Sequence, residues 1–516
     1  MLDATPLLRL YARRRKAQLA AENAPEAQRS ELLRLVRQAQ ETAFGVAHGF
    51  DGIGDVEDFQ RRVPLRSYED FWRDYWQARF PLLTDLTWPG TIPYFAATSG
   101  TTTGKTKYIP VSREMSASNR GAVLDLLAHH LAARPRSRLL AGKNFMLGGS
   151  TDLVERAPGV YSGDVSGIAA NEVPWWVRPR YFPPRRYALM TDWEQKIDTL
   201  ARLSLREDIR SLSGTPSWVL LFFAKLAELR PDLPRRSTSY YPELELFIHG
   251  GINFAPYRPQ FEELLEGSRA ESREVYAASE GFIAAADRGY GDGLRLIVDR
   301  GIFYEFVPVD EVGATEPTRH WLATAQSDVN YAIVLSTCAG LWSYLPGDTV
   351  KFVELRPPRL LITGRLSYFL SAFGEHLIAE EIETAVAAAG AEIGSQVADF
   401  TVTPIFPSAE RQRGGHLYVV EFSAPVDSAM LARFARALDE SLSAQNQDYR
   451  DHRSGGFGME APRVLAAKPG SFAQWMKSRG QIGGQHKVPR VIQDRELFRS
   501  LEEFLTRTHG VRSRAP

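Results

Sequence analysis

The chain has 516 residues, more than one hydrophobic core can organise, because cores stop growing near roughly 250–300 residues. Hydrophobic residues make up 44% and charged residues 24%, as in ordinary globular proteins, and this composition excludes a disordered chain. The 62 basic and 62 acidic residues balance, and neither half of the chain is a charged tail, so we expect no nucleic acid as a partner.

The single cysteine, Cys338, lies in the apolar run IVLSTCAGLW, which predicts a buried strand. We interpret it as a core residue, because no positive charge beside it in the sequence would activate a catalytic thiol. No apolar stretch approaches the roughly 20 residues of a membrane helix, and the N-terminal positive charge follows the apolar residues, unlike in a secretory signal. We therefore expect a cytoplasmic protein, in a reducing compartment, with no membrane partner.

The first 90 residues carry helical patterns. In EDFWRDYWQARF, aromatic residues recur every three or four positions, which predicts the core face of a helix rather than a ligand pocket. From 92 to 360, short β-branched or aromatic runs such as LELFIHGG, EVYAASEG and YAIVLS alternate with amphipathic stretches such as NRGAVLDLLAHHLAA. This alternation predicts a layered α/β sheet. The prolines at 174–184 predict an irregular loop.

A change of organisation follows Gly364-Arg365. Beyond it a helix pattern, two strand patterns and a further helix pattern follow one another over about 150 residues, a common domain size. The predicted fold class is therefore α/β, with a large layered α/β N-terminal domain at 1–363 and a smaller α+β C-terminal domain at 364–516.

The segment ATSGTTTGKTKYIPV, at 97–111, is the strongest candidate for chemistry. It follows a strand pattern, gathers small and hydroxyl residues around Gly100 and Gly104, and ends in Lys105 and Lys107, so that N–H, O–H and ammonium groups can converge on a polyphosphate. One alternative is a Walker A loop, which needs four residues between its glycines and a helix after them. Here there are three, and KYIPV has a strand pattern. The other alternative is a flexible hairpin loop without a ligand.

Two further segments each present one carboxylate at a turn. In EVYAASEGFIA the strand pattern ends before Glu280, and a carboxylate there is what a phosphate-bound Mg²⁺ needs, since this ion takes one or two carboxylates together with phosphate oxygens. In WSYLPGDTVKF, Asp348 follows a Pro-Gly turn, where it is suited to accept hydrogen bonds from two ribose hydroxyls. Each acid has a plainer interpretation as a solvated turn residue.

In this order the segments resemble motifs of the acyl acid amido synthetases known from plant hormone conjugation, within the superfamily of acyl-adenylating enzymes. The matches run from 98 to 490, nearly the whole chain. The third motif departs from the family at Leu345, where an Arg is common, and the fourth at His486, which replaces an aromatic residue. The matching residues, motif by motif, are Thr98, Ser99, Gly100, Thr101, Gly104 and Lys107; Tyr276, Ser279 and Glu280; Tyr344, Gly347 and Asp348; and Gln485, Lys487, Pro489 and Arg490.

The resemblance implies the fold of acyl-adenylating enzymes and a site for ATP and Mg²⁺. The 98–107 loop would hold the β- and γ-phosphates, and Gly250-Gly251 would admit the adenine beside Tyr276. Lys487 would reach the reacting groups when a mobile C-terminal domain rotates about Gly364-Arg365. The implied set comprises catalytic Lys487 and Lys107; nucleotide-binding Thr98, Ser99, Gly100, Thr101, Thr102, Gly104, Lys105, Gly250, Gly251, Tyr276, Ser279 and Asp348; and metal-binding Glu280.

The activity that the resemblance implies has two steps. A small carboxylic acid attacks the α-phosphate of ATP to give an acyl adenylate and pyrophosphate, and an amine, such as an amino acid, then displaces AMP to form an amide. Two alternatives remain beside this one: an acyl-coenzyme A ligase that uses the same adenylate, and a non-catalytic relative that binds a nucleotide. A P-loop kinase is disfavoured by the glycine spacing of the 97–111 segment.

Overall fold

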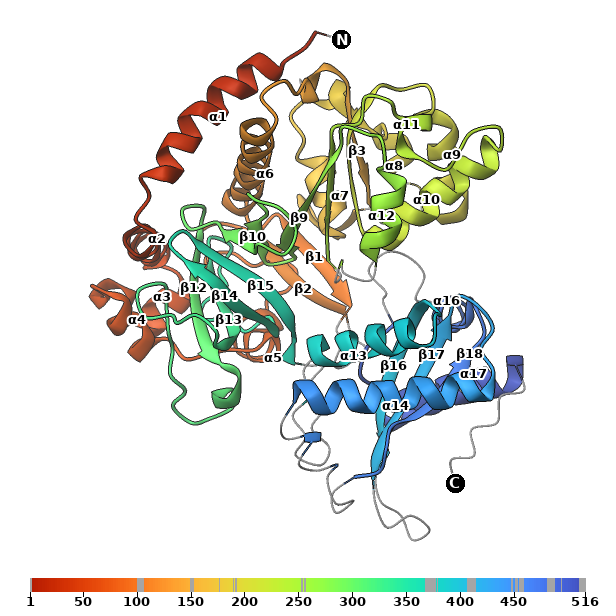
Figure 1. The fold of residues 1–516 in the computed structure, drawn as a ribbon. Coiled ribbons are helices and arrows are strands. Elements are labelled where there is room, and N and C mark those ends of the chain that lie inside the picture. Colours follow the sequence, from red (N-terminus) through yellow and green to blue (C-terminus); the bar gives the residue numbers. More distant parts are fainter. Residues whose placement is uncertain are drawn as a thin grey trace. The chain divides into compact units, whose positions relative to one another are not determined.

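In the computed structural model of the protein, the residues described are 2–99, 106–148, 153–175, 177–188, 190, 193–251, 254, 257–366, 377, 379–405, 414–446, 449–450, 453, 459–479, 488–492 and 494–509. The chain divides into two compact units (Figure 1). The larger comprises residues 1–100, 104–346 and 350–362, and the smaller comprises 101–103, 347–349 and 363–516. The division passes through strands β14 (Asp348–Leu355) and β15 (Pro358–Arg365).

The larger unit is built on a mixed sheet whose strand order is β12-β13-β14-β15-β11-β10-β9-β8-β7-β3-β6. β3, β7, β8 and β9 run parallel, whereas β10 pairs antiparallel with β9 and β11. The runs LELFIHGG, EVYAASEG and YAIVLS form strands of this sheet, which confirms the predicted layered α/β architecture. Besides β14 and β15, the strands of this sheet are β3 (Lys143–Leu147), β6 (Tyr181–Phe182), β7 (Ile209–Gly214), β8 (Leu246–Gly250), β9 (Glu271–Ala278), β10 (Gly281–Ala285), β11 (Leu294–Leu296), β12 (Ile302–Pro308) and β13 (Asn330–Thr337).

A second sheet has the order β2-β1-β5-β4. Its strands are β1 (Tyr94–Ser99), β2 (Thr106–Val111), β4 (Val154–Ala157) and β5 (Val160–Gly163). The long helix α6 (Arg113–Ala133) follows β2 directly and is capped by Ser112, whose side chain accepts the N–H of Met115. The helix packs on β10, because Ala122 and Leu126 are buried against Phe282.

The other helices of the larger unit confirm the predicted helical character of the first 90 residues and the α/β alternation after them. None of the helices in the described part of the chain is long and apolar enough to cross a membrane. Besides α6, the α-helices of the larger unit are α1 (Thr5–Ala20), α2 (Ala24–Ala39), α3 (Ala43–Ala47), α4 (Val56–Arg62), α5 (Tyr68–Phe71), α7 (Val165–Asn171), α8 (Arg185–Ala188), α9 (Trp193–Ser204), α10 (Pro216–Leu229), α11 (Ser237–Tyr240) and α12 (Arg258–Leu264).

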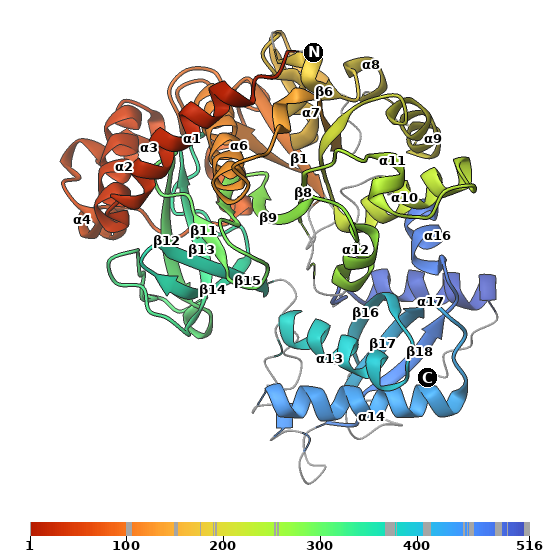
Figure 2. The same cartoon turned by 45° about the horizontal axis from the view of Figure 1, so that its top comes forward.

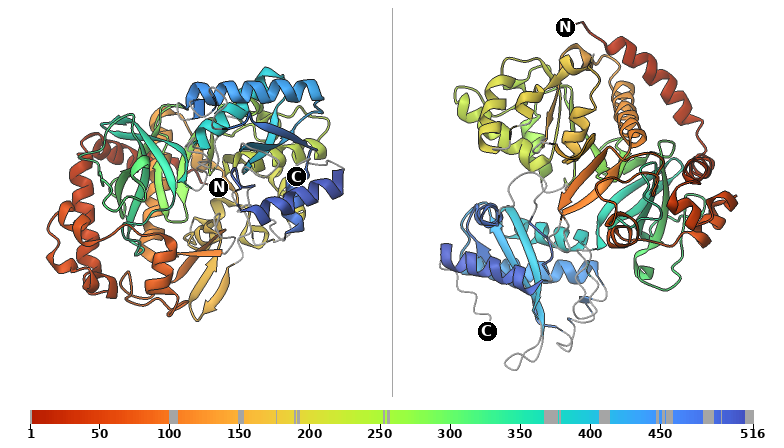
Figure 3. Two further views of the ribbon diagram at one scale, coloured as in Figure 1. Left: turned by 90° about the horizontal axis from the view of Figure 1, so that it is seen from below. Right: turned by 180° about the vertical axis from the view of Figure 1, so that it is seen from behind.

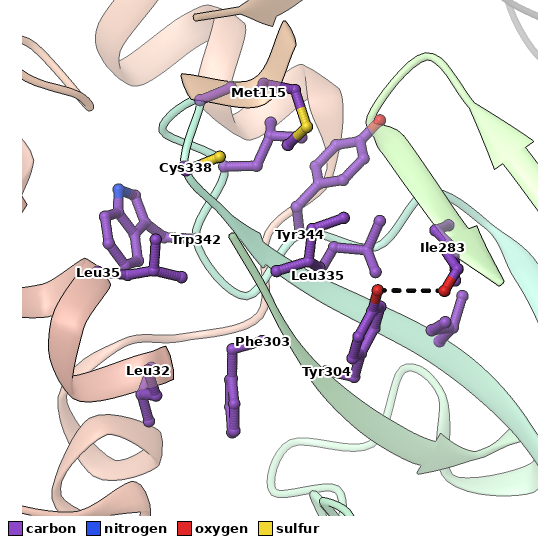
Figure 4. Close-up of a cluster of buried hydrophobic side chains, with 14 of the residues drawn as sticks. Leu32, Leu35, Met115, Ile283, Phe303, Tyr304, Leu335, Cys338, Trp342 and Tyr344 are labelled. Atoms are coloured by element: carbon purple, nitrogen blue, oxygen red, sulfur yellow. Dashed lines mark hydrogen bonds between the residues drawn. The ribbon is translucent and has the colours of Figure 1, made fainter. Parts of the chain in front are cut away.

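The main core of the larger unit joins the N-terminal helices to β12 and β13. Figure 4 shows Leu35 of α2, Phe303 of β12 and Leu335 of β13 in one buried cluster, together with Cys338. Cys338 is 1% exposed, and burial raises the pKa of its thiol to about 12, which confirms the predicted unreactive core cysteine. The aromatic pattern of residues 69–80 also points into this core, as predicted, since Phe71, for example, is fully buried.

One expectation about local structure was wrong. The segment 174–184, predicted to be irregular throughout, contains the two-residue strand β6, which pairs with Asn144 and Phe145 at the end of the large sheet. Phe182 is 1% exposed and packs edge-on against Phe145, with ring centroids 4.7 Å apart. Burial of this ring explains why a proline-rich stretch joins a sheet, and Pro183 ends the strand.

The smaller unit is a three-stranded sheet of order β16-β17-β18 with helices on both faces. Successive residues of β17 alternate between two cores: Tyr418 and Val420 face α13 and α14, whereas Leu417 and Val419 face α16 and α17. The two pairs of helices lie on opposite faces (Figures 1, 2 and 3). The elements are α13 (Ala379–Glu392), β16 (Val397–Ile405), β17 (Gly415–Phe422), α14 (Ser428–Gln445), β18 (Arg463–Ala467), α16 (Ser471–Ser478) and α17 (Arg495–His509), and they confirm the predicted α+β layer.

Candidate active site

The Ser/Thr/Gly-rich segment forms the end of a β-hairpin. β1 and β2 are antiparallel, with Thr98 opposite Lys107 and Ser99 opposite Thr106. Because a strand, not a helix, follows the loop, the arrangement departs from a Walker A loop, as the sequence predicted. The predicted phosphate-binding residues of the loop itself, Gly100, Thr101, Thr102, Gly104 and Lys105, lie outside the described residues.

Lys107 is held by the short helix α5. Its Nζ atom lies 3.0 Å from Oε1 of Glu69 and 5.1 Å from the centre of the Tyr68 ring. The Tyr68 hydroxyl in turn accepts the backbone N–H of Tyr108 at 3.0 Å, so α5 contacts β2 both at the lysine and at the residue that follows it. Sequence analysis did not find Glu69 as the partner of Lys107, and no motif or spacing in the sequence links the two.

The β9–β10 hairpin presents the second candidate motif. Ala278 and Gly281 pair directly, so Ser279 and Glu280 form a two-residue turn. A side chain at Gly281 would meet Cδ1 of Ile302 at 2.8 Å, and the N–H of Phe282 donates to Oδ1 of Asn119 on α6 at 2.9 Å. The turn is therefore fixed from both sides, and Glu280 is 9% exposed on it.

Glu280 offers a single buried carboxylate, which is compatible with the ligand set of a phosphate-bound Mg²⁺. In the described part of the chain no group of three or more His, Cys, Asp or Glu side chains is close enough to hold a metal ion. Mg²⁺ usually takes one or two carboxylates and completes its shell with phosphate oxygens and water. One buried carboxylate at a rigid turn satisfies that requirement.

The ends of β8 and β9 meet at one place in the sheet. The strands are parallel, with Gly250 opposite Val275, so Tyr276 follows one position later on the neighbouring strand. A Cβ atom at Gly250 would lie 2.3 Å from the carbonyl oxygen of Val275, and Gly251 has φ = +79°, so both positions require glycine. In open α/β sheets ligands bind beyond the carboxyl ends of parallel strands, and these glycines lie there.

Asp348 is the first residue of β14. Oδ1 of Asp348 lies 2.8 Å from Nε of Arg365, and the N–H of Leu366 donates to the carbonyl of Gly347 at 2.6 Å. The side chain of Asp348 is 14% exposed. The third motif and the predicted hinge residue Arg365 are therefore in direct contact.

A buried ion pair supports the start of the third motif. Glu305 is fully buried, and its carboxylate accepts hydrogen bonds from Arg319 and from Ser343. Ser343 has φ = +44°, a conformation that costs free energy in a residue other than glycine, and the hydrogen bond from Nη2 of Arg319 to Oγ of Ser343 at 2.7 Å holds it. Tyr344 follows, 3% exposed. Sequence analysis missed Glu305 and Arg319, because they act through packing and carry no motif.

The fourth motif is described only from its end. Gln485, His486 and Lys487 lie outside the described residues, whereas Pro489 and Arg490 run alongside β16. The carbonyl of Pro489 accepts the hydroxyl of Thr401 at 2.6 Å, and the carbonyl of Arg490 accepts the N–H of Val402 at 2.8 Å. The Arg490 guanidinium pairs with Asp399, so this motif residue anchors the segment that follows Lys487.

Comparison with known proteins agrees with this geometry. The GH3 family N-terminal domain matches residues 13–159, the central domain residues 295–365 and the C-terminal domain residues 380–496, together more than half of the chain. An indole-3-acetic acid-amido synthetase, GH3.8, of Oryza sativa subsp. indica is 25% identical over 62% of this chain. The matched stretch spans 57% of that protein, just over half of its length.

Two kinds of solved structure share the fold. GH3.15 acyl acid amido synthetase superimposes with a TM-score of 0.78 at 19% identity, over 94% of each chain. A 2-hydroxyisobutyryl-CoA ligase in the postadenylation state superimposes with a TM-score of 0.61 at 18% identity, over 95% of this chain and 93% of that one. The fold is thus that of acyl-adenylating enzymes. With three family domains matched in order along its length, the chain belongs to the GH3 family.

Proposed function

We propose that the chain is an ATP-dependent acyl acid amido synthetase, which adenylates a small carboxylic acid and transfers the acyl group to an amine, with an amino acid as the expected acceptor. The observation that carries this proposal is the convergence of Gly250-Gly251, Tyr276 and Glu280 on neighbouring strand ends of the sheet. Membership of the GH3 family supports it, as does the amido synthetase activity named for the rice relative.

The chemical problem of the first step is that an anionic carboxylate must approach a triphosphate, so catalysis depends on positioning and on neutralising charge. The glycines leave room for the adenine beside Tyr276, and Asp348 accepts hydrogen bonds from the ribose. Glu280 would hold Mg²⁺, and the bound ion would supply charge neutralisation to the phosphates. Lys107 exchanges its contact with Glu69 for one with the nucleotide, and the donors of the 98–105 loop complete the site.

We propose that the two domains have different roles in the reaction. A large domain at 1–363 holds the nucleotide and the acid, and a small C-terminal domain at 364–516 brings Lys487 to the reacting groups and rotates between the two half-reactions. We also propose a cytoplasmic location, in keeping with a chain that has one cysteine.

Acid-dependent pyrophosphate release tests the first step without knowledge of the acceptor. The purified chain is given ATP, Mg²⁺ and a panel of aromatic and aliphatic acids, and the best acid is then offered a mixture of amino acids. We expect pyrophosphate release with some acid, and an amide in the second assay. The variant Glu280→Gln tests the proposed metal ligand in the same assay. Its matched control is Glu263→Gln, at an exposed glutamate on α12. Release of no pyrophosphate with any acid would contradict the proposal.

A second candidate is an acyl-coenzyme A ligase, favoured by the likeness in fold to the 2-hydroxyisobutyryl-CoA ligase. It shares the adenylate and differs in the acceptor. The same acid is therefore offered coenzyme A in place of amino acids, and formation of a thioester without any amide would favour this candidate.

A further inference from the structure

A stack of aromatic rings surrounds the end of β8. The imidazole of His249 contacts the rings of both Phe247 and Phe254, with centroid distances of 5.1 and 3.8 Å, and Phe254 meets Tyr290 edge-on at 5.5 Å. His249 immediately precedes Gly250-Gly251, and Phe254 comes three residues after Gly251. The two rings that lie closest together, those of His249 and Phe254, therefore flank in the sequence the glycines that we propose to admit the adenine.

A small cavity adjoins this stack. About 20 Å³ of it is open to the centre of a water molecule, which is room for one, and its lining includes His249, Ser272, Glu274 and Tyr290. Nε2 of His249 lies 2.8 Å from the hydroxyl of Ser272. Its Nδ1 atom is buried and has no hydrogen-bond partner within the described residues, and His249 is 2% exposed. Buried polar atoms in proteins are normally hydrogen-bonded, so Nδ1 of His249 is a buried acceptor in need of a partner.

Glu274 is the group in this cavity whose charge changes near neutral pH. Burial raises the pKa of its carboxyl to about 7, and within the described part of the chain it takes part in no ion pair. Burial lowers the pKa of His249 to about 3, so the imidazole stays neutral. Burial and the nearby Glu274 raise the pKa of Tyr290, while Arg258 of α12, 5.0 Å from its ring, acts in the opposite direction. β15 contributes Leu361, which has no charge.

The cavity is connected to the candidate nucleotide site through the backbone. His249 and Glu274 are opposite each other in the parallel pair β8–β9, and Gly250 and Val275 are the next pair. Since Gly250 fits against the carbonyl of Val275 with no space for a Cβ atom, a shift of Glu274 relative to His249 moves the glycines as well. Tyr276 lies two residues beyond Glu274 on the same strand.

We propose that Glu274 is a positioning residue for the nucleotide, and that its neutral form holds the ends of β8 and β9 in the arrangement that receives the adenine. The proposal rests on the proposed function. A neutral carboxyl can donate a hydrogen bond to a water molecule bound in the cavity, and that water can donate in turn to Nδ1 of His249. Loss of the proton places a partly buried negative charge next to a site for a polyanion, so ATP affinity falls as pH rises. By linkage, bound ATP favours the protonated carboxyl.

Affinity for a non-hydrolysable ATP analogue, measured by calorimetry from pH 6 to 8.5, tests this without knowledge of the acid or the amine. The variant is Glu274→Gln, which keeps the shape of the neutral form, and the control is Glu263→Gln on the surface of α12. We expect the dissociation constant of the unmodified protein and of the control to rise about three- to tenfold over this range, while that of Glu274→Gln stays nearly constant. A role in stability alone would shift the affinity equally at every pH.

Two results overturn the inference, and they are distinguishable. If Glu274→Gln binds the analogue with the same pH profile as the unmodified protein, Glu274 does not act through its proton, and the proposed function is untouched. If no variant binds at any pH, the proposed function fails and the inference fails with it. Should Glu274→Gln fold poorly, the steady-state KM of the unmodified protein for ATP is measured instead. A KM that does not rise between pH 6 and 8.5 overturns the inference.

Discussion

The Asp348 carboxylate, which starts β14, lies 2.8 Å from the Arg365 guanidinium, which ends β15. The acid proposed to bind ribose is therefore in contact with the residue at the predicted hinge. We expect Asp348→Ala to weaken ATP binding by roughly ten- to a hundredfold, because hydrogen bonds to a charged group contribute about 1.5–3 kcal/mol each.

Comparison of ATP with 2′-deoxy-ATP makes the role of Asp348 specific. The unmodified protein should bind the deoxy nucleotide more weakly, and Asp348→Ala should bind both nucleotides alike, since the acceptor of the 2′-hydroxyl is gone. Asp232→Ala, at a surface position, is the control. Equal binding of the two nucleotides by the unmodified protein would remove Asp348 as the ribose ligand.

The ion pair of Lys107 with Glu69 allows a catalytic role to be separated from a structural one. We expect Lys107→Met to lower acid-dependent pyrophosphate release about a hundredfold, the effect of removing one donor from a site of developing charge. Glu69→Gln removes the same ion pair but leaves the ammonium, and should retain activity within a few-fold, because exposed pairs contribute about 0–1 kcal/mol. Equal losses in the two variants would make the pair structural.

Gly250 offers a test of the close approach of β8 to β9. A Cβ atom there would lie 2.3 Å from the carbonyl of Val275, so Gly250→Ala must push the strands apart. We expect a lower melting temperature and weaker nucleotide binding, with a cost of about 1–3 kcal/mol for the overpacking. The control is Gly54→Ala, where the nearest atom to the new Cβ is Oδ2 of Asp58 at 3.7 Å. Unchanged nucleotide affinity in Gly250→Ala would show that this backbone contact does not shape the site.

Glu271 predicts how the larger unit responds to acid. Burial alone would raise the pKa of its carboxyl, but hydrogen bonds from His130 and Arg273, at 2.7 and 2.6 Å, outweigh burial and lower the pKa to about 2. Its stabilising contribution, up to about 3 kcal/mol, is present above pH 4.5 and is lost as pH falls toward 2. Glu271→Gln should therefore destabilise the protein more at pH 7 than at pH 3 in thermal unfolding. A stability difference between the two proteins that does not change with pH would contradict this.

Local patterns in the sequence were enough to predict the strands that build the site. β8 and β13 are short apolar or β-branched runs bounded by turn residues, and most of their side chains are buried for that reason. The glycines at 250 and 251 were also visible, but their need for glycine depends on the carbonyl of Val275, which another strand supplies. Contacts between strands distant in sequence leave no periodic pattern.

The partners of the site residues were likewise beyond the sequence. Glu69 reaches Lys107 because α5 packs beside β2, and Arg319 supports Ser343 because a loop after β12 folds back on it. Arg490 matches the family's fourth motif, yet its guanidinium pairs with Asp399 at the side of β16, a contact that the motif does not predict. Lys487 and the 100–105 loop lie outside the described residues, and their roles stay predictions.

The burial of Cys338 makes the chain a ready background for site-directed labelling. The Cys338 thiol has a pKa of about 12 and is tightly packed, since a Cβ atom at Gly301 would lie 2.5 Å from its Sγ atom. It will therefore not react with a maleimide dye at neutral pH. Two introduced cysteines, for example Glu57→Cys on α4 and Glu440→Cys on α14, then carry a donor and an acceptor fluorophore without replacement of the native Cys338. Energy transfer between them, followed with ATP and acid and then with the amine, reads out the proposed rotation in the unaltered active site.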